Sequence, residues 1–362
     1  MSIILFFVIL AVLVLVHEFG HFFAAKRFGV RVDEFGLGFP PKLWSKKVGE
    51  TVYSVNAIPF GGFVKIFGEN PDEDSINGSD KGRSFVHIAK WKQAIVLASG
   101  VFMNVLFAWL LFSIAYLSGM TTIVSGTDAK YIQDAHVLIL ATLPESPAEK
   151  AGFLPGDQVR AFAIGGATTT APSVDELQAA VKSSEGQALV FDVDRVGEKV
   201  YLEVLPEKAA ADAYAIGVSM DQAGKVVLPL HLAIWEGGKL TVDMFVGIAT
   251  NLYTLAHDAL LGKADFSQVS GPVGIARLVG DAGKLGIVYL LSFTAFISLN
   301  LAVLNLVPFP ALDGGRILFV LIEAIKRSPI KPVIANWTNT VGFGLLILLM
   351  LFITYRDIVR LF

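Results

Sequence analysis

The residues best suited to chemistry lie near the start of the chain, in the sequence HEFGH at positions 17–21. This is an H-E-x-x-H pattern, and on a helix its two histidines lie on one face, one turn apart. Two such imidazoles can share one Zn²⁺ at about 2.0–2.1 Å. A glutamate beside the attacking water can act as general base. The spacing therefore predicts a catalytic zinc site with His17 and His21 as ligands and Glu18 as the base.

The motif lies inside an apolar stretch that runs from about residue 3 to residue 28. Ionisable groups in such a segment are costly unless they are paired or bind a ligand, which favours a functional interpretation. A polar cluster satisfied by neighbouring atoms is the structural alternative. A signal peptide is disfavoured because no positive charge precedes the apolar run, and a His-Glu pair has no use in a disposable leader.

A catalytic zinc ion needs a third protein ligand and an open position. Because the chain has no cysteine, this ligand must be a histidine or a carboxylate. The other histidines lie outside the apolar segments, whereas Asp313 directly follows one, in NLVPFPALDGG at 305–315. The prolines break a helix there, and the paired glycines allow close backbone approach. We expect Asp313 to be the third ligand, with a turn or a helix N-cap as its alternative role.

Composition indicates a membrane protein that carries some soluble mass. Hydrophobic residues make up 54% of the 362 residues and charged residues 17%, against about 45–50% and about 25% in soluble domains. Mean hydropathy is +0.62. The net charge of −3 does not suggest a nucleic-acid-binding protein. Four apolar segments approach the length of about 20 residues that spans a bilayer. They run from about 3 to 28, 94 to 117, 286 to 307 and 341 to 354, and the last is the shortest.

Basic residues concentrate in two connections, 26–92 and 316–331. The positive-inside rule puts both in the cytoplasm. Four spans then leave both termini and the long segment 121–284 on the extracytoplasmic side of the cell inner (plasma) membrane. The first and third spans both run inwards, and His17 lies about 13 Å from the cytoplasmic boundary at 1.5 Å per helical residue. His17 and Asp313 should therefore meet towards the cytoplasmic side.

Residues 121–210 are predicted to form a small β-rich domain. Short apolar runs alternate with turn signals at 135–143, 158–164, 188–193 and 199–205. One helical pattern covers 174–182. The sequence SPAEKAGFLPGD at 146–157 resembles the signature of bacterial PDZ domains. PDZ domains bind extended peptide ends by strand addition, and a spacer that only restricts access is the alternative.

The expected fold is a polytopic α-helical membrane protein with four transmembrane helices, a small extracytoplasmic PDZ domain and a membrane-associated β-hairpin. Residues 1–120 carry the first two spans, the H-E-x-x-H motif and a cytoplasmic re-entrant hairpin loop. Residues 286–362 carry the last two spans and Asp313. The intervening segment 211–285 is predicted to be helical and amphipathic. It would lie on the outer membrane surface or pack against the β-rich domain.

Together these motifs resemble the site-2 protease family of intramembrane metalloproteases, in particular its RseP-like branch. The resemblance covers nearly the whole chain, with the motif at 17–21, the PDZ-like insert and the motif at 305–314 in the family's order. It implies zinc ligation by His17, His21 and Asp313 and catalysis by Glu18. Well-known members of this branch carry two tandem PDZ domains, whereas this chain has the length for one.

The resemblance also implies substrate-binding residues. GLGF at 36–39 resembles the family's G-x-G segment. The segment 52–67 resembles its membrane-re-entrant β-hairpin, which is thought to present substrate as an added strand. Gly61, Gly62 and Phe63 belong to this segment, and a plain cytoplasmic hairpin is the alternative. Asn305 is implied in substrate positioning, with a helix–helix hydrogen bond as its alternative role.

The expected function is zinc-dependent endoproteolysis inside the membrane. The expected substrates are single-span membrane proteins already cut outside, such as an anti-sigma factor, or remnant signal peptides. The lipid bilayer and peptide ends at the PDZ domain are the other expected partners. A membrane scaffold with a structural metal and a metal transporter are the competing classes, but neither needs a glutamate between the two histidines.

Overall fold

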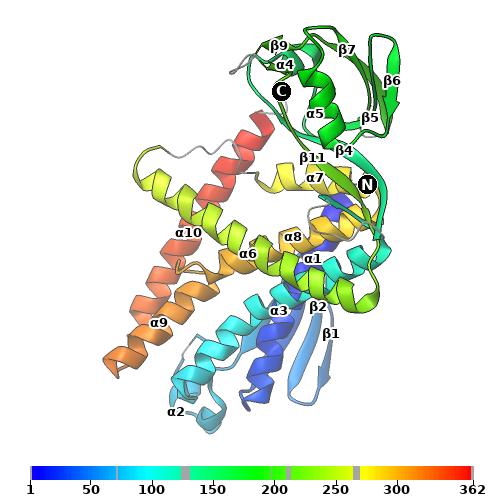
Figure 1. The fold of residues 1–362 in the computed structure, drawn as a ribbon. Coiled ribbons are helices and arrows are strands. Elements are labelled where there is room, and N and C mark those ends of the chain that lie inside the picture. The colour runs from blue at the N-terminus through cyan, green and yellow to red at the C-terminus, as the bar shows by residue number, and fades with distance from the viewer. Residues whose placement is uncertain are drawn as a thin grey trace. The chain divides into compact units, whose positions relative to one another are not determined.

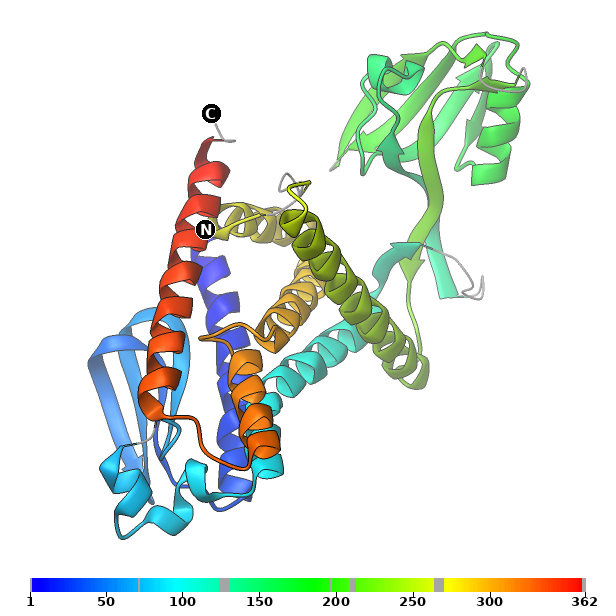
Figure 2. The same cartoon turned by 90° about the vertical axis from the view of Figure 1, so that its left-hand side faces the viewer.

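The computed structural model describes residues 2–70, 72–123, 131–195, 197–208, 213–263 and 270–359. The chain forms two compact units, shown in Figures 1 and 2. Unit 1 contains Met1–Ile114 and His231–Phe362 and is mainly helical, whereas unit 2 contains Ala115–Leu230 and is mainly β-structure. This division agrees with the apolar helices and the β-rich insert predicted from the sequence.

Four helices in the described part of the chain are long and apolar enough to cross a membrane. They are α1 (Ser2–Arg27), α3 (Lys90–Ser118), α8 (Ile287–Leu306) and α10 (Pro332–Val359). Their number agrees with the four predicted spans, but α10 begins well before the expected residue 341. The polar run ANWTNT at 335–340 interrupts the hydropathy without interrupting the helix, because each of these residues tolerates helical geometry.

The remaining helices are shorter or more amphipathic. They are α2 (Glu73–Asn77), α4 (Pro147–Ala151), α5 (Val174–Lys182), α6 (Leu230–Leu260), α7 (Pro272–Leu285) and α9 (Asp313–Lys326), with 3₁₀ turns at Lys81–Arg83 and Phe85–His87. The first half of α6 packs on α3, where the Trp109 indole donates a hydrogen bond to the Ile234 carbonyl at 2.8 Å. Contact with α3 is thus one role of the amphipathic segment, and its position on a membrane surface stays a prediction.

The end of α10 is fastened to the start of α7. The buried carboxylate of Asp357 accepts hydrogen bonds from the amides of Gly271 and Gly274 at 3.2 and 2.8 Å. It therefore caps the first turn of α7 from another helix, since these amides have no partner within their own helix. This contact joins two segments that lie more than eighty residues apart in the chain.

Strands β1 (Val32–Val48) and β2 (Thr51–Ile66) form an antiparallel hairpin in unit 1. Both strands bend, so that residues 34–37 pair with 52–55 on one side and with 62–65 on the other. The order across the sheet is therefore 42–48, 51–56, 32–37 and 62–66. The hairpin is more extensive than expected, because 52–67 is one arm of it and 36–39 lies on the other arm. The strand β1 was not predicted along its full length because it contains Pro40 and Pro41, and proline is rare within strands.

One face of this sheet packs on α1, and one edge is free. The rings of Phe35 and Tyr53 lie 5.3 and 6.1 Å from the ring of Phe22 in α1. Figures 1 and 2 both show the hairpin beside α1. Among the described residues, segment 62–66 pairs with a neighbouring strand on one side only. Half of its backbone groups are therefore available to another chain.

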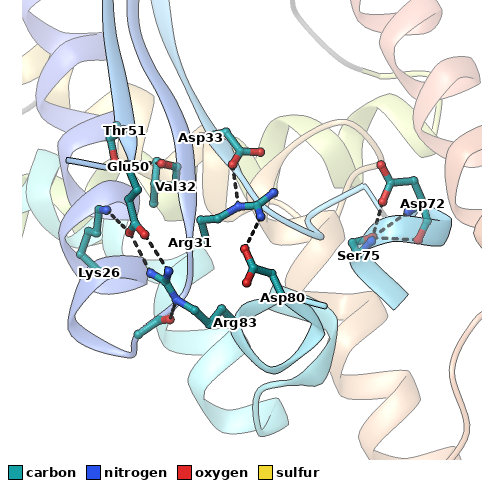
Figure 3. A network of polar contacts seen from close by, with 11 residues as sticks. Lys26, Arg31, Val32, Asp33, Glu50, Thr51, Asp72, Ser75, Asp80 and Arg83 are labelled. Carbon is teal, nitrogen blue, oxygen red and sulfur yellow. Dashed lines mark hydrogen bonds and ion pairs between the residues drawn. The ribbon is translucent and has the colours of Figure 1, made fainter. Parts of the chain in front are cut away.

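A network of ion pairs anchors the hairpin next to the end of α1 (Figure 3). Glu50, in the turn between the two strands, pairs with Lys26 of α1 at 2.5 Å and with Arg83 at 2.7 Å. Arg31 pairs with Asp33 at 2.9 Å and with Asp80 at 2.6 Å. The turn of the hairpin is thereby held to α1 and to the segment before α3.

We expect the Glu50 contribution to hairpin stability to disappear in acid. Hydrogen bonds from Arg83 and Lys26 lower the pKa of Glu50 from 4.5 to about 2. The folded state binds this proton less tightly than the unfolded state, so the stabilisation is complete above pH 4.5 and is lost as pH falls towards 2. Glu50→Gln should raise the rate of pepsin cleavage within the hairpin roughly threefold at about pH 5, as expected for partly exposed ion pairs.

The measurement is the ratio of the cleavage rates of Glu50→Gln and wild type, which cancels the pH dependence of pepsin. This ratio should approach one at about pH 2, because the wild-type hairpin has then lost nearly all of the stabilisation that the Glu50 charge provides. Glu203→Gln, a substitution on an exposed strand of unit 2, provides the control. A ratio that does not change with pH would contradict the assignment.

Unit 2 is built on a seven-stranded antiparallel sheet in the order β3-β11-β4-β5-β7-β8, with β6 paired to β5. The strands are β3 (Met120–Ile123), β4 (Ile132–Thr142), β5 (Gln158–Ile164), β6 (Ala167–Thr170), β7 (Leu189–Arg195), β8 (Glu198–Val204) and β11 (Val218–Val226). A separate pair joins β9 (Glu207–Lys208) and β10 (Tyr214–Ala215). The four predicted strands correspond to β4, β5, β7 and β8, and the predicted helix corresponds to α5.

Local signals explain the edges of the elements in unit 2. Ser173 caps α5 and forms a reciprocal capping box with Glu176. Phe153 and Phe191 are fully buried in the core, where their rings lie 5.2 Å apart. The carboxylate of Asp157 accepts a hydrogen bond from the Leu154 amide at 2.9 Å and closes the expected turn. The assignment of this unit as a PDZ domain stays a prediction.

Candidate metal centre

His17 and His21 occupy the same face of α1, as the i, i+4 spacing requires. Both are buried, with 6% and 7% of their surface exposed. Their Nε2 atoms lie 3.2 Å apart. Two buried imidazole nitrogens at this separation could bind one metal ion together.

Asp313 completes the group from the other end of the sequence. Its Oδ2 lies 2.9 Å from Nε2 of His17 and 3.2 Å from Nε2 of His21. Ligand atoms at about 2.0–2.1 Å from a tetrahedral ion lie about 3.3 Å from one another, so the three atoms are spaced as zinc requires. The structure thus brings together the three ligands expected from the sequence. Asp313 is the first residue of α9, whereas Leu312 is the N-cap, so the capping alternative does not hold.

The irregular segment between α8 and α9 brings Asp313 to the histidines. A methyl group at Gly314 would lie 2.3 Å from the carbonyl oxygen of Leu306, so only glycine allows the chain to fold back this closely. The amide of Ala311 donates to Oδ1 of Asn339 in α10 at 3.3 Å. The expectation that glycine at 305–315 allows a close approach of the backbone is therefore confirmed at Gly314.

Two contacts from α3 orient the histidines, and neither was predicted from the sequence. Nδ1 of His21 donates to the carbonyl oxygen of Val96 at 2.8 Å when Nε2 is the ligand atom. The carboxamide of Asn104 lies 3.2 Å from Nδ1 of His17. The atom at this distance is the amide nitrogen of Asn104, and its side-chain oxygen has no partner among the described residues. Because a metal-bound Nε2 leaves the proton on Nδ1, the amide must turn over so that its oxygen accepts this proton when the metal is bound. Asn104 was detectable as a polar residue inside an apolar span.

Gly100, one turn before Asn104 on α3, leaves the space that the metal centre needs. A methyl group at this position would lie 2.5 Å from Nε2 of His21 and 2.8 Å from Nε2 of His17. Both distances are far below van der Waals contact, so any side chain here would overlap the ligand atoms. The cradle is therefore formed by α1, α3 and the start of α9.

Glu18 lies between the metal centre and the free edge of the hairpin. A methyl group at Gly62 would lie 3.7 Å from Cγ of Glu18, and the backbone of Val64 is within hydrogen-bonding reach of its carboxylate. Gly61, the residue before it, lies near Val14 of α1. The edge segment and Glu18 therefore lie next to each other.

Phe63 and Asn305, the other residues expected to bind substrate, lie in different surroundings. The ring of Phe63 packs over Gly36, on the face of the sheet opposite to Gly62, because successive strand residues point to opposite faces. Asn305 is half-buried in the last turn of α8, just before the irregular segment. The structure thus brings Gly62 to the centre but leaves the roles of Phe63 and Asn305 as predictions.

The donor set of two imidazoles and one carboxylate is the one that zinc uses in hydrolytic sites, with the fourth position open to water or substrate. The spacing of the three ligand atoms, the burial of both histidines and the space left at Gly100 fit a single ion of this size. A glutamate next to the first histidine adds the base that hydrolysis of a peptide bond requires.

Comparison with known proteins gives the same answer over the whole chain. The model of Peptidase family M50 matches residues 5–349. A Clostridium perfringens protein named as a candidate zinc metalloprotease is 34% identical over 96% of this chain and 95% of its own. Zinc metalloprotease RasP of Geobacillus kaustophilus is 29% identical over 100% of this chain and 98% of its own. The chain therefore belongs to peptidase family M50, the site-2 protease family, and is a zinc metalloprotease.

Proposed function

We propose that this enzyme cleaves single-span membrane proteins inside the bilayer, with His17, His21 and Asp313 as zinc ligands and Glu18 as the base. The position of the ligands carries the proposal. Two of them lie within an apolar helix, and the third meets them directly after another apolar helix. A peptide bond that reaches these side chains must therefore approach from within the membrane.

Different residues of the chain have different roles in the proposed hydrolysis. Bound Zn²⁺ supplies Lewis acidity towards the scissile carbonyl. Glu18 accepts the proton of the attacking water and transfers it to the leaving nitrogen. The Val96 carbonyl and Asn104 hold the two imidazoles so that their Nε2 atoms face the metal position.

Substrate is proposed to bind as a strand along the free edge 62–66. A helical substrate hides its peptide bonds in internal hydrogen bonds, so cleavage needs an unwound segment. The edge offers backbone donors and acceptors to such a segment. Because Gly62 lies beside Glu18, a strand added there passes the base. Gly61, Gly62 and Phe63 would hold the added strand, and Asn305 would position it.

The enzyme is proposed to reside in the cell inner (plasma) membrane with both termini and residues 121–210 outside. The four apolar helices and the basic connections 26–92 and 316–331 support this orientation. The active site then lies towards the cytoplasmic side, since α1 enters from outside and its basic last turn follows the motif.

The proposed substrates are anti-sigma-factor-like proteins already cut outside, or remnant signal peptides. Unit 2 is proposed to act as a PDZ domain that either excludes large ectodomains or binds the peptide ends left by the first cut. Its compact core and antiparallel sheet support a folded module of this kind.

Asp313→Ala is expected to lower zinc affinity by more than about a hundredfold, beyond the 10–100-fold typical of a residue that only supports a ligand. Its carboxylate is one of three ligands, and alanine leaves an incomplete set. Zinc stoichiometry after dialysis against a weak chelator measures the effect, with Asp258→Asn as the control on the exposed face of α6. Wild-type zinc content would remove Asp313 from the ligand set.

The proposed function is tested with the full-length enzyme in liposomes and a single-span model substrate. Mass spectrometry of the products should place the cut inside the apolar segment of the substrate. Removal of zinc by a chelator should stop cleavage, and added zinc should restore it. A cut confined to the soluble flanks, or cleavage that persists without metal, would contradict intramembrane zinc proteolysis.

A further inference from the structure

A groove of about 430 Å³ runs along the hairpin past the free edge. It follows the chain from Phe63 to Gly68 and reaches Asp72 and Asp74, which lie beyond the end of β2. One end of the groove is therefore close to Gly62 and the proposed base. The other end opens at an acidic stretch of the chain.

The charge of the groove is mainly negative. Its charged lining residues are four carboxylates and two cations, namely Asp33, Glu69, Asp72, Asp74, Arg31 and Lys65. Arg31 is held between two carboxylates, as Figure 3 shows, so its charge is compensated. Glu69 is likewise paired with Arg316. Lys65, the other cation, is close enough to Asp72 to act on its charge. With Glu73 beside Asp72 and Asp74, carboxylates still outnumber cations at the far end of the groove.

Three exposed carboxylates form this far end: Asp72, Glu73 and Asp74. None of them makes an ion pair with any residue that the structure describes. The Asp72 carboxylate accepts the Ser75 amide at 2.8 Å, and hydrogen bonds from Ser75 keep the pKa of Asp72 below its usual value. The three side chains are exposed and available to a cationic partner.

The direction of the groove indicates which part of a substrate would meet these carboxylates. Gly62 lies beside Glu18, whereas the Phe67 amide donates to the carbonyl oxygen of Arg31 at 2.9 Å, beyond the end of α1. A strand added along the edge therefore runs from the depth of Glu18 to the boundary marked by the basic end of α1. Membrane-spanning proteins carry an excess of lysine and arginine on their cytoplasmic flank.

We propose that the acidic end of the groove, Asp72, Glu73 and Asp74, binds the basic cytoplasmic flank of the substrate. The enzyme would thereby prefer membrane segments followed by several lysine or arginine residues. This inference rests on the proposed function and orientation. The contacts are remote from the scissile bond and are made equally before and during the reaction, so they act on KM rather than on kcat.

The test uses two single-span substrates that differ only in their cytoplasmic flank, with four lysines in one and four glutamines in the other. The wild-type enzyme in neutral liposomes should show a roughly fivefold lower KM for the lysine substrate, as expected for a few exposed ion pairs. The preference should shrink at high salt. The triple variant D72N/E73Q/D74N should lose the preference. Its D72N change should preserve the N-cap of α2, because asparagine caps a helix as well as aspartate does.

Two further variants sharpen the experiment. The matched control E185Q/E198Q/E203Q removes three exposed charges from unit 2 and should keep the preference. The charge reversal D72K/E73K/D74K should instead favour a substrate with a glutamate flank. The inference would be overturned, with proteolysis intact, if the wild type had the same KM for both substrates. It would also be overturned if the variant D72N/E73Q/D74N raised the KM of both substrates by the same factor. Failure of the wild type to cleave either substrate would overturn the proposed function, and the inference with it.

Discussion

Glu18→Gln should bind zinc like the wild type and lose cleavage of a single-span substrate by about two to four orders of magnitude, the usual contribution of a general base. Glutamine has the shape of glutamate but accepts no proton from the attacking water. The three ligand atoms belong to other residues and keep their positions. The variant therefore separates metal binding from chemistry.

The measurement combines zinc content with the rate of product formation at saturating substrate. Glu236→Gln, at a half-buried position of α6, is the matched control and should keep both values. The same variant distinguishes the competing functions, because a metal transporter or a scaffold has no need of a base. Cleavage at the wild-type rate would remove Glu18 from the mechanism and the protease assignment would lose its catalytic centre.

The chemistry of the site was predictable because its signals are local. The spacing of His17 and His21 fixes their common face on any helix. The prolines and glycines within 305–315 predict an irregular segment from the local sequence alone. An even number of crossings between the two motifs was then enough to predict that His17 and Asp313 meet. The strands of unit 2 were likewise visible in short apolar runs bounded by turn residues.

The rest of the site depends on contacts between segments, which a single sequence does not display. Gly100 is one glycine in an apolar helix until α1 is placed against it. Asn104 faces His17 only because α3 has that rotation. The order of the strand segments in the hairpin depends on which of several possible pairings is most stable. Residues 34–37 pair with 52–55 on one side and with 62–65 on the other. These features follow from packing rather than from propensity.

The ion pairs in Figure 3 fix the position of the hairpin relative to α1. The ion pairs of Glu50 hold its turn to α1, the helix that also carries both histidines. The hairpin is therefore held by the same helix that carries Glu18. A substrate strand at the edge would be positioned relative to Glu18 by backbone pairing, independent of its sequence, which leaves the flanking charges to provide selectivity.

Gly100→Ala should abolish zinc binding, although alanine is the better helix former. The added methyl group would lie 2.5 Å from Nε2 of His21. His21 has little freedom to move away, because its other nitrogen is held by the Val96 carbonyl at 2.8 Å. The imidazole must therefore turn its ligand atom away from the other two ligands, or α3 must separate from α1.

Zinc stoichiometry and the thermal midpoint of the metal-free protein measure the two parts of this expectation. Gly247→Ala is the matched control, since a methyl group on this exposed helical glycine meets nothing within 4 Å. The control should raise stability slightly, by about 0.4–1 kcal/mol, and keep its zinc. Gly100→Ala should lose zinc even where the metal-free protein remains folded, because the overlap is with the ligand atoms themselves. A folded Gly100→Ala protein with one tightly bound zinc would show that the ion is held elsewhere than between α1 and α3.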